Sequence, residues 1–298
     1  MGLIDYSNDG RVLSAAERQF YDKNGYIIIK RCLPQYDLQR FSKRFQEICE
    51  GKDVPATATV MRDVAIAKSE FVPGEKAITK VQDFNNDPVL FDYCRHPAIV
   101  DIVDDLIGTP NCTLMSMHTM LINKPPDSGK LTSRHPLHQD LQYFPFRPAD
   151  YIICAWSAME HVHRQNGCLV IVPGSHKGKL LDHDYPKWEG GVNKAYYGIQ
   201  EYNPSSMKLL HVEMEPGDTV FFHPLLIHGS GANRTEGFRK AISCHYANGN
   251  KCKYIDTKSL KWQRNAWTNL GITADTLSFQ KIWEVRGRSL NDGKRANL

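Results

Sequence analysis

The sequence predicts a mainly β fold, a sandwich or jelly roll with helices packed on its outside. Helical periodicity is confined to the first third of the chain, and short β-rich runs separated by Pro- and Gly-rich turns follow it. No apolar run approaches the roughly 20 residues that cross a bilayer. We expect a single domain over residues 1–298, with a helical part at about 14–110, a jelly-roll core at about 111–250 and a helical or irregular tail at 251–298.

Three helices are predicted in the N-terminal part: one from Ser14 to Gly25, one over Pro34–Cys49 and one over Pro97–Ile107. Ser14 and Glu17 form a capping box, in which each side chain satisfies a free backbone N–H. Gly25, Gly51 and Gly108 follow the three periodic segments as stop signals. Residues 52–80 carry no clear period, so we expect them to be irregular.

Six runs rich in β-branched and aromatic residues predict the strands: Tyr26–Ile29, Leu114–Ile122, Tyr151–Ala158, Cys168–Val172, Thr219–Phe222 and Ala241–Tyr246. Residues 177–208 lie between two of these runs and are long, polar and rich in aromatic side chains. A loop of that length usually acts as a lid or binding loop, and a plain surface excursion is the alternative.

The charge balance argues against a nucleic-acid partner. The chain has 37 Lys and Arg against 33 Asp and Glu, a net charge of +4, with no concentrated basic run. Such a small excess is compatible with an acidic small-molecule substrate. The eight cysteines include no C-x-x-C pair, so we expect reduced core thiols.

His138-Gln139-Asp140 is the first candidate metal site. If the segment is a strand, His138 and Asp140 point to the same face and can bind one ion. A third ligand is available at His228, which on its own would read as a core histidine. Two His and one carboxylate leave three positions open, the arrangement of non-haem Fe(II) oxygenases.

A keto acid could occupy two of the open positions, and its distal carboxylate then needs a cationic partner. Arg239 supplies a planar, permanently charged fork, and Ser230 can add a hydroxyl donor. A zinc hydrolase also suits two His and a carboxylate. In that reading no general base presents itself, and Arg239 has no role.

Four segments carry a resemblance to a known family: His118–Lys130, Ser133–Asp140, Asp184–Lys194 and Gly217–Gly231. They are similar to the phytanoyl-CoA dioxygenase family of Fe(II)- and 2-oxoglutarate-dependent oxygenases. The resemblance extends from about Leu13 to the C-terminus and is looser after Asp256. It implies a double-stranded β-helix, the jelly roll of these oxygenases.

The resemblance also implies the site residues. The iron ligands fall on His138, Asp140 and His228, and the 2-oxoglutarate-binding positions fall on Lys80, Met120, Trp156, Ser230 and Arg239, with Gln139 beside them. Without it, Lys80 would read as a solvated surface lysine and Trp156 as plain core. Because Asp140 is present, a halogenase, which leaves that coordination position to halide, is not expected.

The implied reaction is 2-hydroxylation of a 3-methyl-branched fatty acyl-CoA, phytanoyl-CoA, the first step of fatty acid alpha-oxidation. The implied cofactors are Fe(II), 2-oxoglutarate and O₂, with ascorbate as a candidate reductant. Five cationic positions could meet the CoA phosphates, or form an ordinary solvated face: His176, Lys177, Lys179, Lys187 and Lys194.

Two other functions remain open at this point. One is a dioxygenase of the same fold that acts on a different acyl or small-molecule substrate. The other is a non-catalytic jelly-roll binding module, although such a module has no need of the intact iron set. The resemblance implies a peroxisomal location. We find no clear presequence, and Ala296-Asn297-Leu298 is a weak C-terminal signal, so a cytoplasmic location is the alternative.

Overall fold

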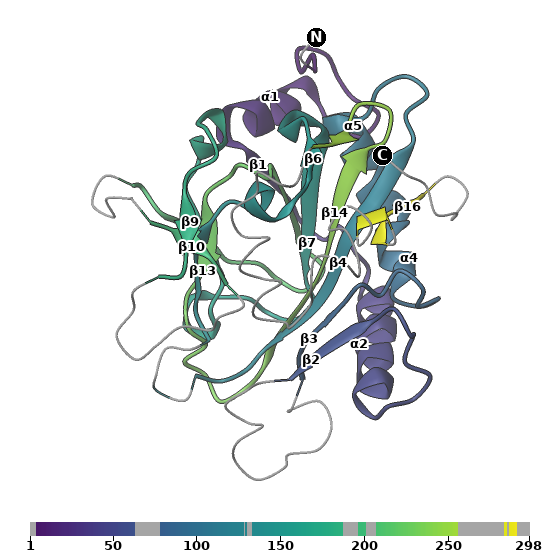
Figure 1. The fold of residues 1–298 in the computed structure, drawn as a ribbon, viewed down its shortest axis with the longest axis vertical. Coiled ribbons are helices and arrows are strands. Elements are labelled where there is room, and N and C mark those ends of the chain that lie inside the picture. Colours follow the sequence, from purple (N-terminus) through teal and green to yellow (C-terminus); the bar gives the residue numbers. More distant parts are fainter. Residues whose placement is uncertain are drawn as a thin grey trace.

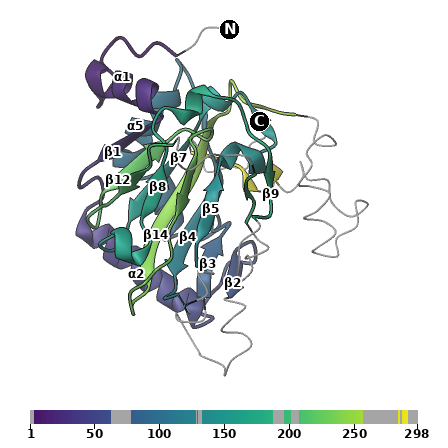
Figure 2. The ribbon, with the colours of Figure 1, turned by 90° about the vertical axis from the view of Figure 1, so that its left-hand side faces the viewer.

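The computed structural model describes residues 4–62, 78–127, 129, 133–186, 196–200, 207–255, 283–284 and 286–290. Two antiparallel sheets dominate it (Figures 1 and 2). The larger sheet has the order β1 (Tyr26–Ile29), β12 (Thr219–Phe222), β7 (Ile152–Ala158), β14 (Arg239–Asn248), β4 (Leu114–Lys124), β3 (Ile78–Gln82) and β2 (Thr59–Arg62), and β16 (Arg288–Ser289) also pairs with β4. The smaller sheet has the order β11 (Leu210–Val212), β8 (Leu169–Ile171), β13 (His228–Ser230) and β5 (His135–His138).

Two short strand pairs complete the described β structure: β9 (His183–Asp184) with β10 (Gly198–Ile199), and β6 (Phe146–Arg147) with β15 (Lys253–Tyr254). The helices are α1 (Ala15–Asn24), α2 (Gln35–Cys49), α4 (Phe91–Cys94) and α5 (Pro97–Ile107). They lie outside the sheets, with α2 and α4 on the far side of the larger sheet from β13 (Figure 1). Within the described ranges, no helix combines the length and apolarity that a bilayer crossing requires.

The two faces of the larger sheet have separate cores. On the outer face, Phe221, Ile242 and Tyr246 pack with buried residues of the helices, among them Phe41 and Leu106. The inner face packs against the smaller sheet through a second cluster. That cluster joins Trp156, Val220 and Ala241 of the larger sheet to Leu169, Ile171 and Val212 of the smaller one. The strand alternation thus separates a helix-covered layer from the interior of the jelly roll.

The helix predictions are confirmed. Ser14 caps α1 in a full capping box with Glu17, and Gly25 ends the helix in the left-handed conformation. Helix α2 begins one residue after the predicted Pro34, and α5 has the predicted bounds with its proline in the first turn. These boundaries depend on local hydrogen bonds and on proline geometry, both of which a short sequence specifies.

The strand predictions hold for all six runs, and no end shifts by more than two residues. The expectation that residues 52–80 are irregular is wrong for residues 59–62, which form β2, and from residue 78 onward, where β3 begins. Neither strand follows an alternating apolar pattern. β3 is ordered by pairing with β4, and β2 pairs with β3 at the edge of the larger sheet. Residues 63–77 between them lie outside the described ranges. All eight cysteines are free, and six are buried.

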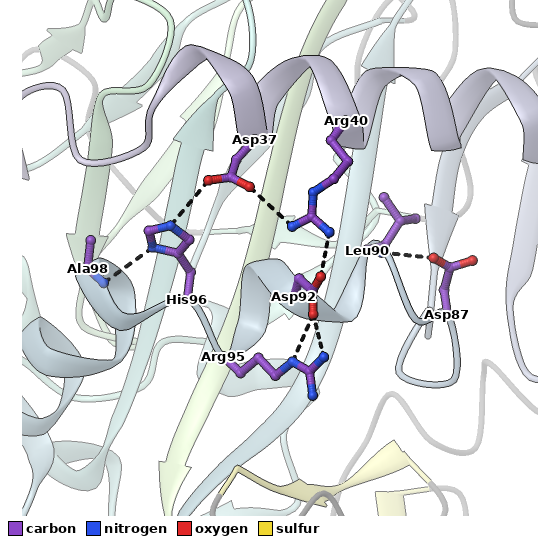
Figure 3. A network of polar contacts seen from close by, with 8 residues as sticks. All are labelled: Asp37, Arg40, Asp87, Leu90, Asp92, Arg95, His96 and Ala98. Carbon is purple, nitrogen blue, oxygen red and sulfur yellow. Dashed lines mark hydrogen bonds and ion pairs between the residues drawn. The ribbon is translucent and has the colours of Figure 1, made fainter.

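A polar network joins the outer helices to one another (Figure 3). Asp37 and Arg40 of α2 face the segment that contains α4. Asp92 accepts hydrogen bonds from Arg40 and from Arg95, and Asp37 lies 3.4 Å from the Nε2 atom of His96. The contacts cross between sequence segments, so they fix the helices against each other rather than each helix alone.

We expect Asp92→Asn to lower the free energy of unfolding at pH 7 by about 1 kcal/mol, measured by urea denaturation. Burial would raise the pKa of Asp92, but the hydrogen bonds from Arg40 and Arg95 hold that pKa below 3.8. A lowered pKa stabilises the fold above the unfolded value, and this stabilisation is lost as the pH falls through the folded value. The difference between the two proteins should therefore shrink below about pH 4. An equal difference at pH 3 and pH 7 would contradict this account.

Candidate functional site

The backbone brings the two candidate histidines together. His228, the first residue of β13, is the direct cross-strand partner of His138, the last residue of β5. Asp140 lies two residues further on and begins a 3₁₀ turn, Asp140–Tyr143. The strand therefore ends before Asp140, which corrects the prediction that both residues belong to one strand, although Asp140 Oδ1 still lies close to His138 Nε2. The extended backbone of Gln139 leaves the side chains of His138 and Asp140 on the same side of the chain, and the 3₁₀ turn begins only at Asp140.

The three side chains offer donor atoms to one point. Asp140 Oδ1 lies 3.2 Å from His138 Nε2 and 3.6 Å from His228 Nε2. One ligand atom from each of these residues lies within 4.8 Å of the other two. All three residues are buried. This is the spacing and donor set of a two-histidine, one-carboxylate metal site.

Backbone carbonyls orient both imidazoles. The Nδ1–H of His138 donates to the Pro136 carbonyl at 2.9 Å, and that of His228 donates to the Leu226 carbonyl at 3.0 Å. With Nδ1 protonated, each neutral ring presents a bare Nε2 lone pair toward Asp140. Metal-binding histidines are commonly held in one tautomer by such a bond.

The electrostatics keep the donor atoms in the protonation states that a metal requires. Burial would raise the pKa of Asp140, but the neighbouring rings of His228 and His245, together with the hydrogen bond from His245, hold that pKa well below its usual value. Burial lowers the pKa of His228 to about 4. At neutral pH the site therefore contains a carboxylate and a neutral imidazole.

His245 is a site residue that the sequence prediction missed. Its Nε2 donates to Asp140 Oδ2 at 2.8 Å, while Oδ1 faces the other two histidines. His245 lies on β14, and residues 239, 241, 243 and 245 of that strand share one face by alternation. That pattern was visible in the predicted strand Ala241–Tyr246, but the partner of His245 was not.

We expect His245→Phe to weaken Fe(II) binding by roughly 10- to 100-fold, since loss of an outer hydrogen bond frees the ligand carboxylate to turn. Phenylalanine preserves the aromatic packing beside Phe144, whose ring centroid lies 4.9 Å away. Anaerobic Fe(II) titration measures the effect. His161→Phe, at an exposed position paired with Glu215, is the matched control. Equal iron affinity in all three proteins would rule out an orienting role.

The predicted 2-oxoglutarate residues lie in rows across the inner face of the larger sheet. Trp156, Ser243 and Met120 are partners across β7, β14 and β4. Lys80 of β3 pairs with Ile122, next along β4 on the same face. Cross-strand partners point to the same side of a sheet, so these side chains share the interior with the metal site.

Arg239 is buried, with only 3% of its surface exposed, and stacks over Trp156 at 5.2 Å from the ring centroid. Its Nη2 donates to the Gly167 carbonyl at 3.0 Å, while Nε and Nη1 have no hydrogen-bond partner among the described residues. Burial lowers the pKa of Arg239 to about 10, so the guanidinium stays charged at neutral pH. Buried cationic donors without partners are what an anionic group requires.

Gln139 is placed differently from the other predicted contacts. Its side-chain amide donates to the Lys179 and Leu225 carbonyls and accepts from the Leu181 N–H. These bonds tie two loops around the metal residues. Its predicted contact with 2-oxoglutarate stays a prediction.

The long loop over residues 177–208 reaches the site through its aromatic side chains. The Tyr196 ring lies 4.1 Å from that of His135, which stacks on His138 at the same distance. Lys80 Nζ lies 5.3 Å from the Tyr196 ring centroid. Tyr197, the residue after Tyr196, donates its backbone N–H to the Tyr143 hydroxyl, and that hydroxyl donates to the Tyr197 carbonyl. These contacts favour the binding-loop interpretation. Three other residues singled out in this loop lie outside the described residues: Lys187, Trp188 and Lys194.

Comparison with known proteins identifies the family to which this chain belongs. The model of the family described as "Phytanoyl-CoA dioxygenase (PhyH)" matches residues 21–241. A Caenorhabditis elegans protein named probable phytanoyl-CoA dioxygenase is 62% identical over 100% of this chain and 99% of its own. The chain belongs to the phytanoyl-CoA dioxygenase family. The human protein named peroxisomal phytanoyl-CoA dioxygenase is 55% identical, over 99% of this chain and 87% of its own length.

Solved structures agree in fold with this member of the phytanoyl-CoA dioxygenase family. The epimerase SnoN, in a complex with Fe³⁺, alpha ketoglutarate and nogalamycin RO, has a TM-score of 0.61 at 20% identity, over 81% of this chain and 86% of that one. EctD from S. alaskensis, solved with 2-oxoglutarate and 5-hydroxyectoine, has a TM-score of 0.62 at 16% identity, over 83% and 80%. The jelly-roll prediction and the assignment to a dioxygenase family are thereby confirmed.

Proposed function

We propose that this protein is an Fe(II)- and 2-oxoglutarate-dependent dioxygenase that hydroxylates phytanoyl-CoA at the carbon alpha to the thioester. The name shared by its relatives supports the substrate. The observation that supports the reaction type is the convergence of His138, Asp140 and His228. Backbone carbonyls orient both imidazoles, and a hydrogen bond from His245 orients the carboxylate.

The donor set fits ferrous iron. His138, Asp140 and His228 would hold the ion through two nitrogens and one oxygen and leave the remaining positions to small molecules. His245 holds the second oxygen of Asp140, so that the carboxylate presents Oδ1 to the ion. The Pro136 and Leu226 carbonyls keep the two imidazoles in the tautomer that a metal needs.

The inner face fits 2-oxoglutarate. The two unpartnered donor groups of buried Arg239 would receive its distal carboxylate, and Trp156 supports the guanidinium from one side. When bound, iron and 2-oxoglutarate together activate O₂ for insertion of a hydroxyl group, with succinate and CO₂ as by-products. The contribution of the chain is to position the reacting groups and to keep water away from them.

The cationic loop remains our candidate for CoA. Lys177 and Lys179 are exposed, as a contact with phosphates requires, and Lys177 lies 3.7 Å from Asp22. His176 donates to the Asp22 carbonyl, which holds the loop against α1. We also propose that the protein works in peroxisomes, since the human and rat relatives are named as peroxisomal.

A coupled assay tests the proposed function. Purified protein with Fe(II), 2-oxoglutarate, ascorbate and O₂ should form succinate and 2-hydroxyphytanoyl-CoA in equal amounts when phytanoyl-CoA is added. An iron chelator should abolish both products. Straight-chain acyl-CoA and free phytanic acid, assayed in parallel, show whether the branch and the CoA group are recognised. Failure of phytanoyl-CoA to increase succinate formation would overturn the substrate assignment.

A further inference from the structure

We propose that Lys124 is a second cationic contact for the distal carboxylate of 2-oxoglutarate, beside Arg239. Lys124 also orients the Ser230 hydroxyl toward the same carboxylate. The proposal rests on the proposed function and deepens it at one end of the cofactor. Neither charge patterning nor the resemblance singled this lysine out. It is the last residue of β4 and the direct cross-strand partner of Arg239 on β14.

The position of Lys124 is the first argument. Only 6% of its surface is exposed, so this is a buried lysine and not a solvated one. It shares the inner face of the larger sheet with Arg239, its register partner. Its Nζ donates to Ser230 Oγ at 2.7 Å. The amino group of Lys124 therefore lies beside the Ser230 hydroxyl, on the same face of the sheet as Arg239.

The charge balance is the second argument. Among the residues that the structure describes, no carboxylate forms an ion pair with Lys124 or with Arg239. Two buried cations side by side are costly, and the cost falls when an anion joins them. Burial and the neighbouring Arg239 lower the pKa of Lys124 well below its usual value, which reflects this missing counter-ion. A bound carboxylate supplies it.

The hydrogen-bond geometry is the third argument. Because Lys124 donates to Ser230 Oγ, the hydroxyl hydrogen of Ser230 is directed away from the lysine and is free to donate to a ligand. Arg239 contributes Nε and Nη1, both of which are buried and lack a partner in the part of the chain that the structure describes. Lysine, serine and arginine thus form one donor cluster for a single carboxylate.

Gly167 makes room for the lysine stem. A Cβ atom at this position would lie 2.8 Å from Lys124 Cε and 2.6 Å from the Gly231 carbonyl oxygen. Its φ of 78° also favours glycine. The same residue accepts the hydrogen bond from Arg239 Nη2. One turn therefore accommodates both cations.

The test compares Lys124→Met, which keeps a flexible apolar stem and removes the charge, with Lys240→Met. Lys240 is the matched control. It follows Arg239 on β14, so its side chain lies on the opposite face of the strand, and its Nζ pairs with Glu160 at 2.9 Å. Fe(II)-loaded protein is titrated anaerobically with 2-oxoglutarate and with 2-oxobutyrate, which lacks the distal carboxylate. The metal-to-ligand charge-transfer absorption reports binding, and the melting temperature of the ligand-free protein is measured in parallel.

We expect Lys124→Met to raise the apparent Kd for 2-oxoglutarate by roughly 10- to 100-fold and to leave 2-oxobutyrate binding unchanged. The ligand-free variant should melt at the same temperature as the unmodified protein or higher, because a buried amine without a counter-ion has gone. Lys240→Met should leave the binding of both keto acids unchanged. This pattern separates recognition of the carboxylate from general damage to the site.

Two results would overturn the proposal. Equal weakening of both keto acids, or a lower melting temperature with unchanged 2-oxoglutarate affinity, would make Lys124 a purely structural support for Ser230. The titration contains no acyl-CoA, so a wrong substrate assignment cannot affect it. Failure of the unmodified protein to bind 2-oxoglutarate would overturn this proposal together with the proposed cofactor.

Discussion

His138→Ala is expected to abolish iron binding and all 2-oxoglutarate-dependent turnover. Alanine removes one of the three donor atoms that His138, Asp140 and His228 offer to the ion, and the remaining pair cannot hold the ion as a facial triad does. It also removes the cross-strand partner of His228 and the ring that stacks on His135. Anaerobic iron titration and succinate formation measure the two losses independently.

His211→Ala is the control for this substitution. His211 lies on β11, at the opposite edge of the same sheet from His138, and should leave iron binding intact. A circular-dichroism spectrum shows whether each variant keeps the sheet. Robust decarboxylation of 2-oxoglutarate by folded His138→Ala protein would show that the ligand assignment is wrong.

Arg239→Met is expected to weaken 2-oxoglutarate binding by roughly 100-fold or more, because truncation of a buried charged donor leaves its anionic partner unpaired. The variant loses the Nε and Nη1 donors as well as the stacking over Trp156. The KM for 2-oxoglutarate and the ligand-induced shift in melting temperature measure the effect. Iron affinity should change little, since Arg239 donates to no metal-site residue in the described hydrogen bonds.

Arg234→Met provides the comparison, because Arg234 is exposed and lies on the segment that leads into β14. It should leave the KM for 2-oxoglutarate unchanged. If Arg239→Met behaves like Arg234→Met, the distal carboxylate binds elsewhere, and the role we assign to Arg239 is excluded.

The candidate metal residues could be read from the sequence, but their geometry could not. His138, Asp140 and His228 were recognisable as a two-histidine, one-carboxylate set. Pro136 disfavours a strand in the segment, and β5 forms nonetheless because it lies at the edge of its sheet, where a missing N–H is tolerated. The strand ends before Asp140, and the hydrogen bond that orients its carboxylate comes from His245, which is distant in the chain.

His245 and Lys124 illustrate the remaining gap. Each lies at an inward position of a β-rich run, where a polar residue is an anomaly. The partner that explains each of them is 105 or 106 positions away in the sequence. Periodicity identifies which residues share one face of a strand, but it does not identify the distant segment that packs against that face.

Local physics was sufficient for three helices of this protein, α1, α2 and α5, and for its six predicted strands. Capping groups, proline and glycine positions and strand alternation specify the helices and the principal strands, because each depends on neighbours within a few residues. The ordering of β2 and β3, the pairing of His228 with His138 and the meeting of Lys124 with Arg239 depend on sheet register. Register follows from the packing of whole faces, so these contacts arise only when the two sheets close on each other.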